Sequence, residues 1–157
     1  MIVSLLLFCG LRKGELVSLQ VSDIDLIKGE ITIKGATSKS KKTRVLKIHP
    51  TLAMHIKGYL GERRSLKTSS LLVSTRRDTA LTVHGLKHWV KTLIEKSGVK
   101  LHLHQFRHTF ACKLAEANTN VFKIQKMMGH TDIAMTMKYV RSMQTQDMAD
   151  DIGKISF

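Results

Sequence analysis

Hydrophobic residues recur at helical spacing at the start of the chain. From Ile2 to Gln20 this spacing predicts a helix that is interrupted at Gly10. The period then changes to two, because apolar and polar residues alternate in Glu30 to Lys34 and again in Arg44 to Ile48. Alternation is typical of strands, so we predict two short strands joined by a polar, lysine-rich hairpin loop from Gly35 to Thr43.

The helical period returns after Pro50, a residue that is well tolerated at a helix start. The predicted helices cover Thr51 to Leu60, Val83 to Ser97, His104 to Ala117, Val121 to Met128, Ile133 to Ser142 and Gln144 to Ile152. A short strand is expected over Ser70 to Ser74. The fold class is therefore α+β and mostly α-helical, with one small antiparallel β-sheet or hairpin, in a single domain over residues 1–157.

The net charge of the chain indicates a class of binding partner. The 157 residues include 26 Lys and Arg against 12 Asp and Glu, a formal net charge of +14. Such an excess favours a polyanion, of which nucleic acid is the commonest, over the alternative of a ribosomal or membrane-surface protein. No acidic residue occurs between Glu30 and Glu62, where lysines crowd the hairpin. A merely solvated hairpin normally has mixed signs, so we expect this one to face phosphates.

Several classes of protein are excluded by what the sequence lacks. Cys9 and Cys112 are too few for a disulfide framework, which favours free thiols and a cytoplasmic location. The apolar run from Ile2 to Cys9 is too short to span a bilayer, which needs about 20 residues. There is no cluster of carboxylates for magnesium and no Cys-x-x-Cys for zinc, and the His84 and His88 pair lacks further ligands. We expect no metal, no cofactor and no membrane partner.

Four short motifs follow one another along the chain. They are Gly10-Leu11-Arg12-Lys13-Gly14-Glu15-Leu16, His104-Gln105-Phe106-Arg107-His108-Thr109-Phe110, Met128-Gly129-His130, and Thr136-Met137-Lys138-Tyr139. Each motif alone is weak, but the ordered set resembles the signature of the tyrosine recombinases of the phage-integrase family. In that family a first arginine motif precedes a His-x-x-Arg box, a Leu-Gly-His and a tyrosine nine positions later. The resemblance covers nearly the whole chain.

The chemistry of phosphodiester cleavage fits these residue types. The pentacoordinate transition state gains negative charge, and arginine stabilises it with a planar, permanently charged fork. Arg12 and Arg107 are the candidate clamp, and His104 lies on the same helix face as Arg107. In isolation, Arg12 would equally suit an ordinary ion pair with Glu15 or Asp23.

Tyr139 is the candidate nucleophile and one of only two tyrosines. A phenol with a pKa of about 10 costs about 4 kcal/mol to ionise at neutral pH, so it needs nearby cations or a base. His130 follows Gly129 on an expected turn, from which it can donate to a phosphate oxygen, although a histidine there also suits a helix cap. Tyr59, in an amphipathic helix, is expected to have an ordinary structural role.

The resemblance implies roles for the basic hairpin. In this family a hairpin lysine protonates the leaving 5′-hydroxyl. The family's order of lysine, short polar loop and strand-opening arginine best fits Lys39, with Lys41 as the reserve. Lys41, Lys42 and Arg44 are expected to contact DNA.

The resemblance also implies supporting roles. Glu15 and Asp23 match acidic positions that support the first arginine and its local turn. His104 is implied to help proton transfer or to orient the phosphate, and His130 to stabilise the transition state. Tyr139 would form a 3′-phosphotyrosyl link that a second strand resolves without metal or ATP.

The function expected from this resemblance is site-specific recombination or integration of double-stranded DNA by a tetramer on two duplexes. The segment from Val140 to Phe157 is expected to dock on a neighbouring protomer. The family's upstream helical domain is missing, so we expect an N-terminally truncated catalytic domain. The alternatives are a type IB topoisomerase-like enzyme, which religates the same strand, and a non-catalytic DNA-binding module that retains the fold.

Overall fold

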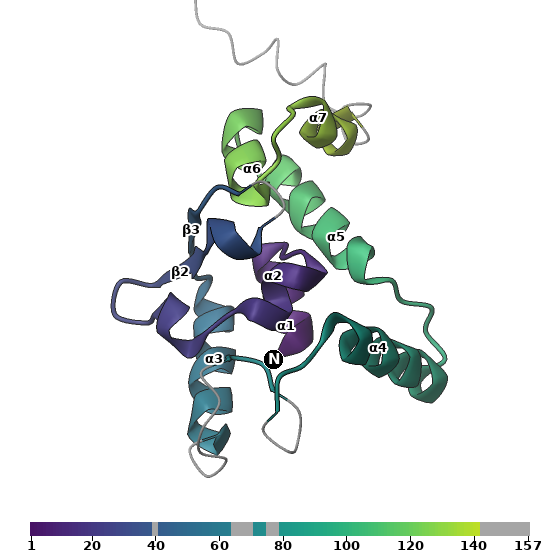
Figure 1. Ribbon diagram of the computed structural model, residues 1–157. Coiled ribbons are helices and arrows are strands. Elements are labelled where there is room, and N and C mark those ends of the chain that lie inside the picture. The colour runs from purple at the N-terminus through teal and green to yellow at the C-terminus, as the bar shows by residue number, and fades with distance from the viewer. Residues whose placement is uncertain (39–40, 64–70, 75–78, 142–157) are drawn as a thin grey trace, which may run out of the picture.

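The computed structural model describes residues 1–38, 41–63, 71–74 and 79–141, and these are mostly helical (Figure 1). The helices are α1 (Ile2–Cys9), α2 (Lys13–Ser18), α3 (Pro50–Arg63), α4 (Val83–Ser97), α5 (Leu103–Glu116), α6 (Val121–Met128) and α7 (Ala134–Arg141), with 3-10 turns η1 (Val21–Asp23) and η2 (Gly35–Thr37). The predicted helices are thus confirmed within these ranges. The helix expected over Gln144 to Ile152 lies outside the described residues.

Gly10 ends α1 as the sequence predicts. Its φ of 55° lies in the left-handed region, and its N–H donates to the Leu6 carbonyl at 3.1 Å. A Cβ at this position would also clash with the ring of Phe110 on α5. Glycine is therefore required both for the backbone conformation and for the close approach of α1 and α5.

The two predicted strands form a sheet with a third strand that was not foreseen. Strands β1 (Ile24–Asp25), β2 (Glu30–Ile33) and β3 (Arg44–Lys47) pair antiparallel in that order. β1 has two residues, too few to show a period in the sequence. A strand was expected over Ser70 to Ser74, of which Ser70 lies outside the described residues. Residues 71–74 take part only in isolated bridges, Gln20 with Leu71 and Ser74 with Ala80.

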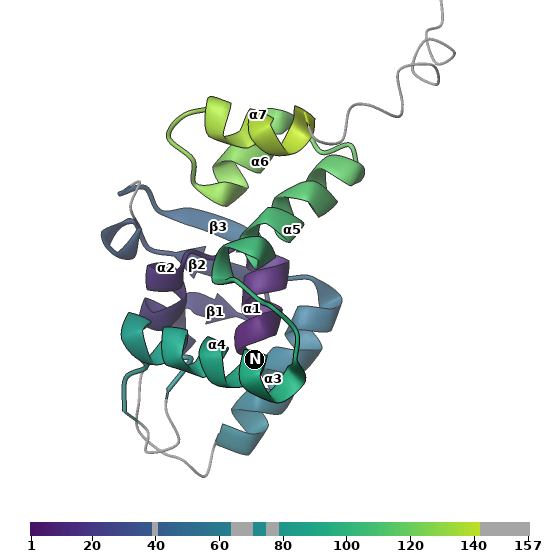
Figure 2. The ribbon, with the colours of Figure 1, turned by 90° about the vertical axis from the view of Figure 1, so that its right-hand side faces the viewer.

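The described residues form two hydrophobic cores. The larger core is formed by helices α1, α2, α3 and α4 together with the sheet, and its fully buried side chains include Leu5, Leu16 and Ile31. The smaller core joins α5, α6 and α7 and contains Phe110 and Met128. Helix α5 packs against α1 as well as against α6 and α7, and Figure 2 shows it between them. In the described part of the chain, no helix is long and apolar enough to cross a bilayer.

Candidate active site

Arg12 opens α2 and is held by Glu15 one turn later. Its backbone N–H donates to Glu15 Oε2 at 2.8 Å, and its Nη1 donates to Oε1 at 3.0 Å. The ion pair considered as the ordinary alternative therefore exists. The Arg12 side chain is nevertheless 23% exposed and lines a cleft, so the pair orients the guanidinium and still leaves it accessible.

Asp23, the other acidic residue singled out, supports the turn and not the arginine. Its Oδ2 accepts from the Gln20 N–H at 2.9 Å, and its Oδ1 pairs with Lys34 Nζ at 2.8 Å. These contacts close η1 and attach it to the start of the hairpin.

The C-terminal end of α6 collects three arginines from distant parts of the chain. The carbonyl oxygens of residues 127–129 accept, in chain order, hydrogen bonds from Arg44 Nε (2.9 Å), Arg107 Nη2 and Arg12 Nη2 (2.8 Å). The last carbonyls of a helix lack partners within the helix and carry the negative end of its dipole, so they suit cations. We call Arg12, Arg44 and Arg107 the arginine cluster.

Arg44 is bound inside the protein, and its expected contact with DNA stays a prediction. It was expected to contact DNA, but its side chain is only 7% exposed and its Nη1 and Nη2 donate to the two Glu15 oxygens at 2.9 and 2.8 Å. With Nε bonded to the Met127 carbonyl, all three nitrogens have acceptors inside the protein. The physical reason is the pleat of β3, which turns alternate residues inward, beginning with Arg44.

Glu15 is ionised in spite of its burial. Burial alone would raise its pKa, but hydrogen bonds from the Arg44 side chain and the Arg12 backbone lower the pKa to about 2. The carboxylate offsets one of the three positive charges of the arginine cluster. The cluster therefore keeps an excess of positive charge beside the cleft.

Arg107 is the most buried member of the cluster, at 3% exposure. Its Nη1 donates to the Gly10 carbonyl at 2.5 Å, which joins α5 to the end of α1. Burial, and then the charge of Arg12, lowers the pKa of Arg107 to about 10. The guanidinium remains charged at neutral pH and lines the same cleft as Arg12.

His130 follows the left-handed Gly129, whose φ is 62°. Its Nδ1 lies 2.8 Å from Thr136 Oγ1 on α7. Burial, followed by the charges of Arg107 and Arg12, lowers the pKa of His130 to about 4, so the imidazole is neutral at pH 7. The His130 ring is stacked on that of Tyr139, with centroids 6.1 Å apart and planes 10° apart.

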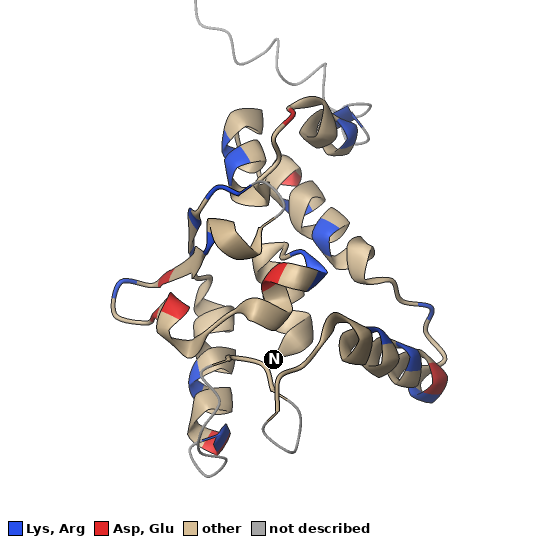
Figure 3. Cartoon of the chain, in the orientation of Figure 1, with Lys and Arg blue, Asp and Glu red and all other residues tan. Residues whose placement is uncertain are grey.

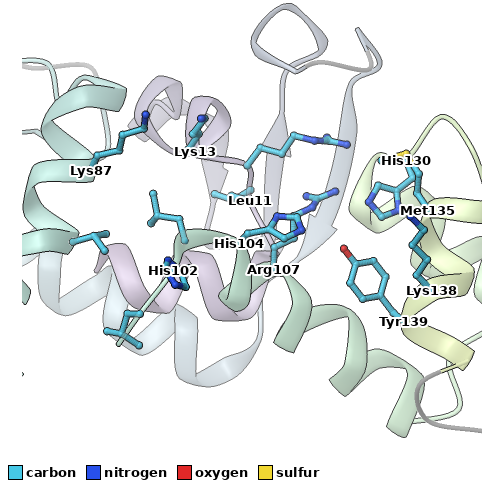
Figure 4. A pocket seen from close by; sticks show the side chains of 14 residues that line it. Leu11, Lys13, Lys87, His102, His104, Arg107, His130, Met135, Lys138 and Tyr139 are labelled. Carbon is cyan, nitrogen blue, oxygen red and sulfur yellow. The ribbon is translucent and has the colours of Figure 1, made fainter. Parts of the chain in front are cut away.

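Tyr139 lies on α7 with its ring in the smaller core and 9% of its surface exposed. Figure 4 shows its hydroxyl directed into the cleft, toward the side where Arg107 and His130 lie. The ring of His108 meets it edge-on, with centroids 5.1 Å apart. The sequence predicts neither this contact nor that of Thr136 with His130, because both depend on how α7 packs against α5 and against the turn before it.

One cleft of about 650 Å³ brings together the predicted catalytic residues that the structure describes. Its lining includes Arg12, His104, Arg107, His130 and Tyr139, together with the lysines Lys13, Lys87 and Lys138 (Figure 4). His104 is exposed on the first turn of α5, at the rim. Arginine and lysine cations, imidazoles and a phenol around one cleft can bind a phosphate and attack it.

Of the hairpin lysines, the structure describes Lys41 and Lys42. Lys39 lies outside the described residues. Lys41 and Lys42 are exposed, and Lys42 lines a neighbouring groove of about 510 Å³ between β3 and α6, together with Lys126. Within the described ranges, no three His, Cys, Asp or Glu side chains gather as metal ligands. That the chemistry needs no metal or cofactor stays a prediction.

Comparisons with known proteins agree with this geometry. Residues 1–146 match the model of the phage integrase family. Tyrosine recombinase XerA of Thermococcus kodakarensis is 36% identical over 143 residues, which are 90% of this chain and 50% of the relative. The chain spans about half the length of the curated relatives it matches.

Solved structures show the same fold. A crystal structure of XerA recombinase superposes with a TM-score of 0.80 at 25% identity, covering 99% of this chain and 58% of that one. The site-specific recombinase XerH, bound to a palindromic difH substrate, superposes with a TM-score of 0.73 at 25% identity, covering 98% and 45%. Because the family model matches residues 1–146 of the 157, this chain belongs to the phage integrase family, as its four motifs and their common cleft indicate.

Proposed function

We propose that this chain is the catalytic domain of a site-specific tyrosine recombinase that cleaves and rejoins double-stranded DNA. The observation that carries the proposal is the position of Tyr139, whose hydroxyl is directed into a cleft lined by Arg12, Arg107 and His130. These groups are the ones that an attack by a phenol on a phosphodiester requires.

The proposed reaction begins with the scissile phosphate in the cleft. The arginines bind its non-bridging oxygens and stabilise the charge that develops on them, while the neutral imidazole of His130 donates a further hydrogen bond. An unperturbed phenol costs about 4 kcal/mol to ionise at neutral pH, and a nucleophilic tyrosine therefore needs cations or a base close by. His104, at the rim, assists proton transfer or orients the phosphate.

The bond changes of the proposed reaction balance without an energy source. The Tyr139 hydroxyl gives its proton to His104 or to solvent as its oxygen bonds to phosphorus, the bond to the 5′-oxygen breaks, and a 3′-phosphotyrosyl link forms. The leaving 5′-oxygen takes a proton from a hairpin lysine, for which Lys39 is the candidate and Lys41 the reserve. A 5′-hydroxyl of the partner strand then attacks the phosphotyrosine, so that each phosphoester bond is replaced and Tyr139 is regenerated.

The charge distribution supports DNA as the substrate. Lys13, Lys87 and Lys138 line the cleft, and Lys42 and Lys126 line the neighbouring groove. Figure 3 shows Lys and Arg on α4, α5, α6 and β3 around this region. Cations gathered around a cleft and its neighbouring groove suit the phosphates of a duplex. The similarity to XerH bound to its difH substrate supports the same partner.

Strand exchange between two duplexes further implies four protomers acting together, which we propose for the assembly on DNA. Native electrophoresis and light scattering of the protein on its site test this part separately. A complex that never exceeds one protomer per site would contradict it.

A nicked suicide duplex tests the proposed chemistry. Sites are first selected from a random-sequence DNA library by binding to the protein, and the nicked site then traps the covalent product because the cleaved strand diffuses away. We expect a protein–DNA adduct that survives denaturation and that Tyr139→Phe abolishes.

Two features make this test decisive. Phenylalanine keeps the ring of residue 139 in the smaller core, and Tyr59→Phe on α3 is the matched control that leaves the adduct unchanged. Binding without any adduct would favour a non-catalytic DNA-binding module. Relaxation of supercoiled plasmid without a specific site would favour a type IB topoisomerase.

A further inference from the structure

Thr136 lies fully buried on α7, one turn before Tyr139, and contacts His130 across the intervening turn. Its Oγ1 is 2.8 Å from His130 Nδ1, and the His130 residue is itself only 9% exposed. A short, buried hydrogen bond of this kind has a defined direction, because one of the two atoms must carry the proton.

The contacts of Thr136 show which atom donates. Two other threonine hydroxyls on helices donate back to the preceding turn, that of Thr92 to the His88 carbonyl (3.2 Å) and that of Thr109 to the Gln105 carbonyl (3.0 Å). Among the described residues, Thr136 Oγ1 has no hydrogen bond other than that to His130.

If Nδ1 carried the proton, the hydroxyl proton of Thr136 would be buried without an acceptor, which is unfavourable because a buried donor loses its hydrogen bonds to water. The hydroxyl therefore donates, and the lone pair of Nδ1 accepts.

The direction of this bond decides what His130 offers to the cleft. A neutral imidazole has one N–H, so an accepting Nδ1 leaves the proton on Nε2. Phosphate oxygens only accept hydrogen bonds when ionised, so an Nε2–H can bind one and a bare Nε2 would repel it.

We propose that Thr136 is a positioning residue that fixes the Nε2–H tautomer of His130 and thereby makes this histidine a hydrogen-bond donor toward an anion in the cleft. The part concerning catalysis rests on the proposed function, whereas the tautomer does not. Since Thr136 and Tyr139 are three residues apart on α7, they lie on one face of that helix. The helix that carries the nucleophile thus also orients the donor beside it.

NMR of the full chain labelled with ¹⁵N-histidine tests the tautomer without DNA. At pH 7.5 we expect His130 to show a pyridine-type Nδ1 and a pyrrole-type Nε2 in the wild type and in Thr136→Ser, which keeps the hydroxyl. Thr136→Val keeps the shape and removes the donor, so a substantial share of the pyrrole-type signal should move to Nδ1. The His130→Gln variant identifies the signals. A pyrrole-type Nδ1 in the wild type, or an unchanged tautomer in Thr136→Val, would overturn the proposal.

The suicide-duplex assay tests the consequence. Thr136→Val should lower the cleavage rate by at least about tenfold. Deleting a transition-state donor costs roughly 10²–10³-fold, and the loss should be smaller than that because the His130 ring is still present. Thr136→Ser should restore the rate. Thr109→Val, which removes a hydroxyl that bonds only to its own helix, is the matched control and should not change the rate. A shifted tautomer with an unchanged rate would refute the role in catalysis. Absence of an adduct in the wild type would instead refute the proposed function and leave the NMR result standing.

Discussion

Gly129 is the position at which a single methyl group should disturb the arginine cluster most directly. It ends α6 with a φ of 62°, and its carbonyl accepts from Arg12. A Cβ there would lie 2.9 Å from Nη1 of Arg44 and 3.4 Å from Nη1 of Arg12. The substitution Gly129→Ala therefore combines backbone strain with crowding of two guanidinium groups.

The two costs can be estimated separately. A non-glycine residue in the left-handed region costs about 1–2 kcal/mol. Displacing Arg44 weakens hydrogen bonds to the ionised Glu15, each worth about 1.5–3 kcal/mol because the groups are charged. We expect Gly129→Ala to lower the free energy of unfolding by about 3–5 kcal/mol, and the Tm by roughly 10 °C for a chain of this size.

Gly98→Ala is a matched control for the strain. Gly98 ends α4 in the same way, with a φ of 70°, but a Cβ there would meet nothing within 4 Å. Urea unfolding of both variants, at unchanged m-value, should give about 1–2 kcal/mol for Gly98→Ala and clearly more for Gly129→Ala. Equal losses would refute the argument, since they would mean that the arginine cluster absorbs the methyl group without cost.

A double-mutant cycle locates the crowding. In an Arg44→Met background the atom nearest to the new Cβ is gone, so Gly129→Ala should cost no more than Gly98→Ala does. If the full cost persisted there, its source would be elsewhere than Arg44.

Three further predictions follow from the charges of the site. Because the pKa of Glu15 is lowered to about 2, the stabilisation that its carboxylate gives the fold is present above pH 4.5 and is lost as the pH falls toward 2. Glu15→Gln should lower the free energy of unfolding by up to about 3 kcal/mol at pH 7. In urea unfolding, this variant should lose less stability than the wild type between pH 4.5 and 2. The pKa of His130, about 4, means that unfolded chains take up its proton first, so stability should fall as the pH drops from 6.5 toward 4, and an NMR titration midpoint near 6.5 would contradict this. Arg44→Lys should lower stability and cleavage while leaving the salt dependence of DNA binding unchanged, because Arg44 is paired with Glu15 inside the protein. Lys42→Ala should instead reduce the slope of log K against log salt by about 1, because Lys42 is exposed in the groove. Equal slopes for both variants would show that Arg44 is wrongly assigned to the interior or Lys42 to the DNA.

Local features of the sequence were sufficient to predict most of the helices and the candidate catalytic residues. Helices α4 and α6 begin and end where predicted. The side chains of Thr82 and Asn120 cap their first turns, and Gly98 and Gly129 adopt left-handed conformations at their ends. The order of the four motifs was also sufficient to group Arg12, Arg107 and Tyr139 before any contact was known, and they line one cleft.

The tertiary structure alone decided how those residues are held. Arg44 reaches the Met127 carbonyl across 83 positions and Arg12 reaches Gly129 across 117, so no local pattern could reveal that both bind the end of α6. The sequence shows Arg44 as one more cation in a basic hairpin, and only the pleat of β3 turns it inward onto Glu15. Likewise, the partner of His130 depends on how α7 packs after its turn. Periodicity and caps act over a few residues, whereas the charge balance of this site results from contacts that exist only once the two cores have packed together.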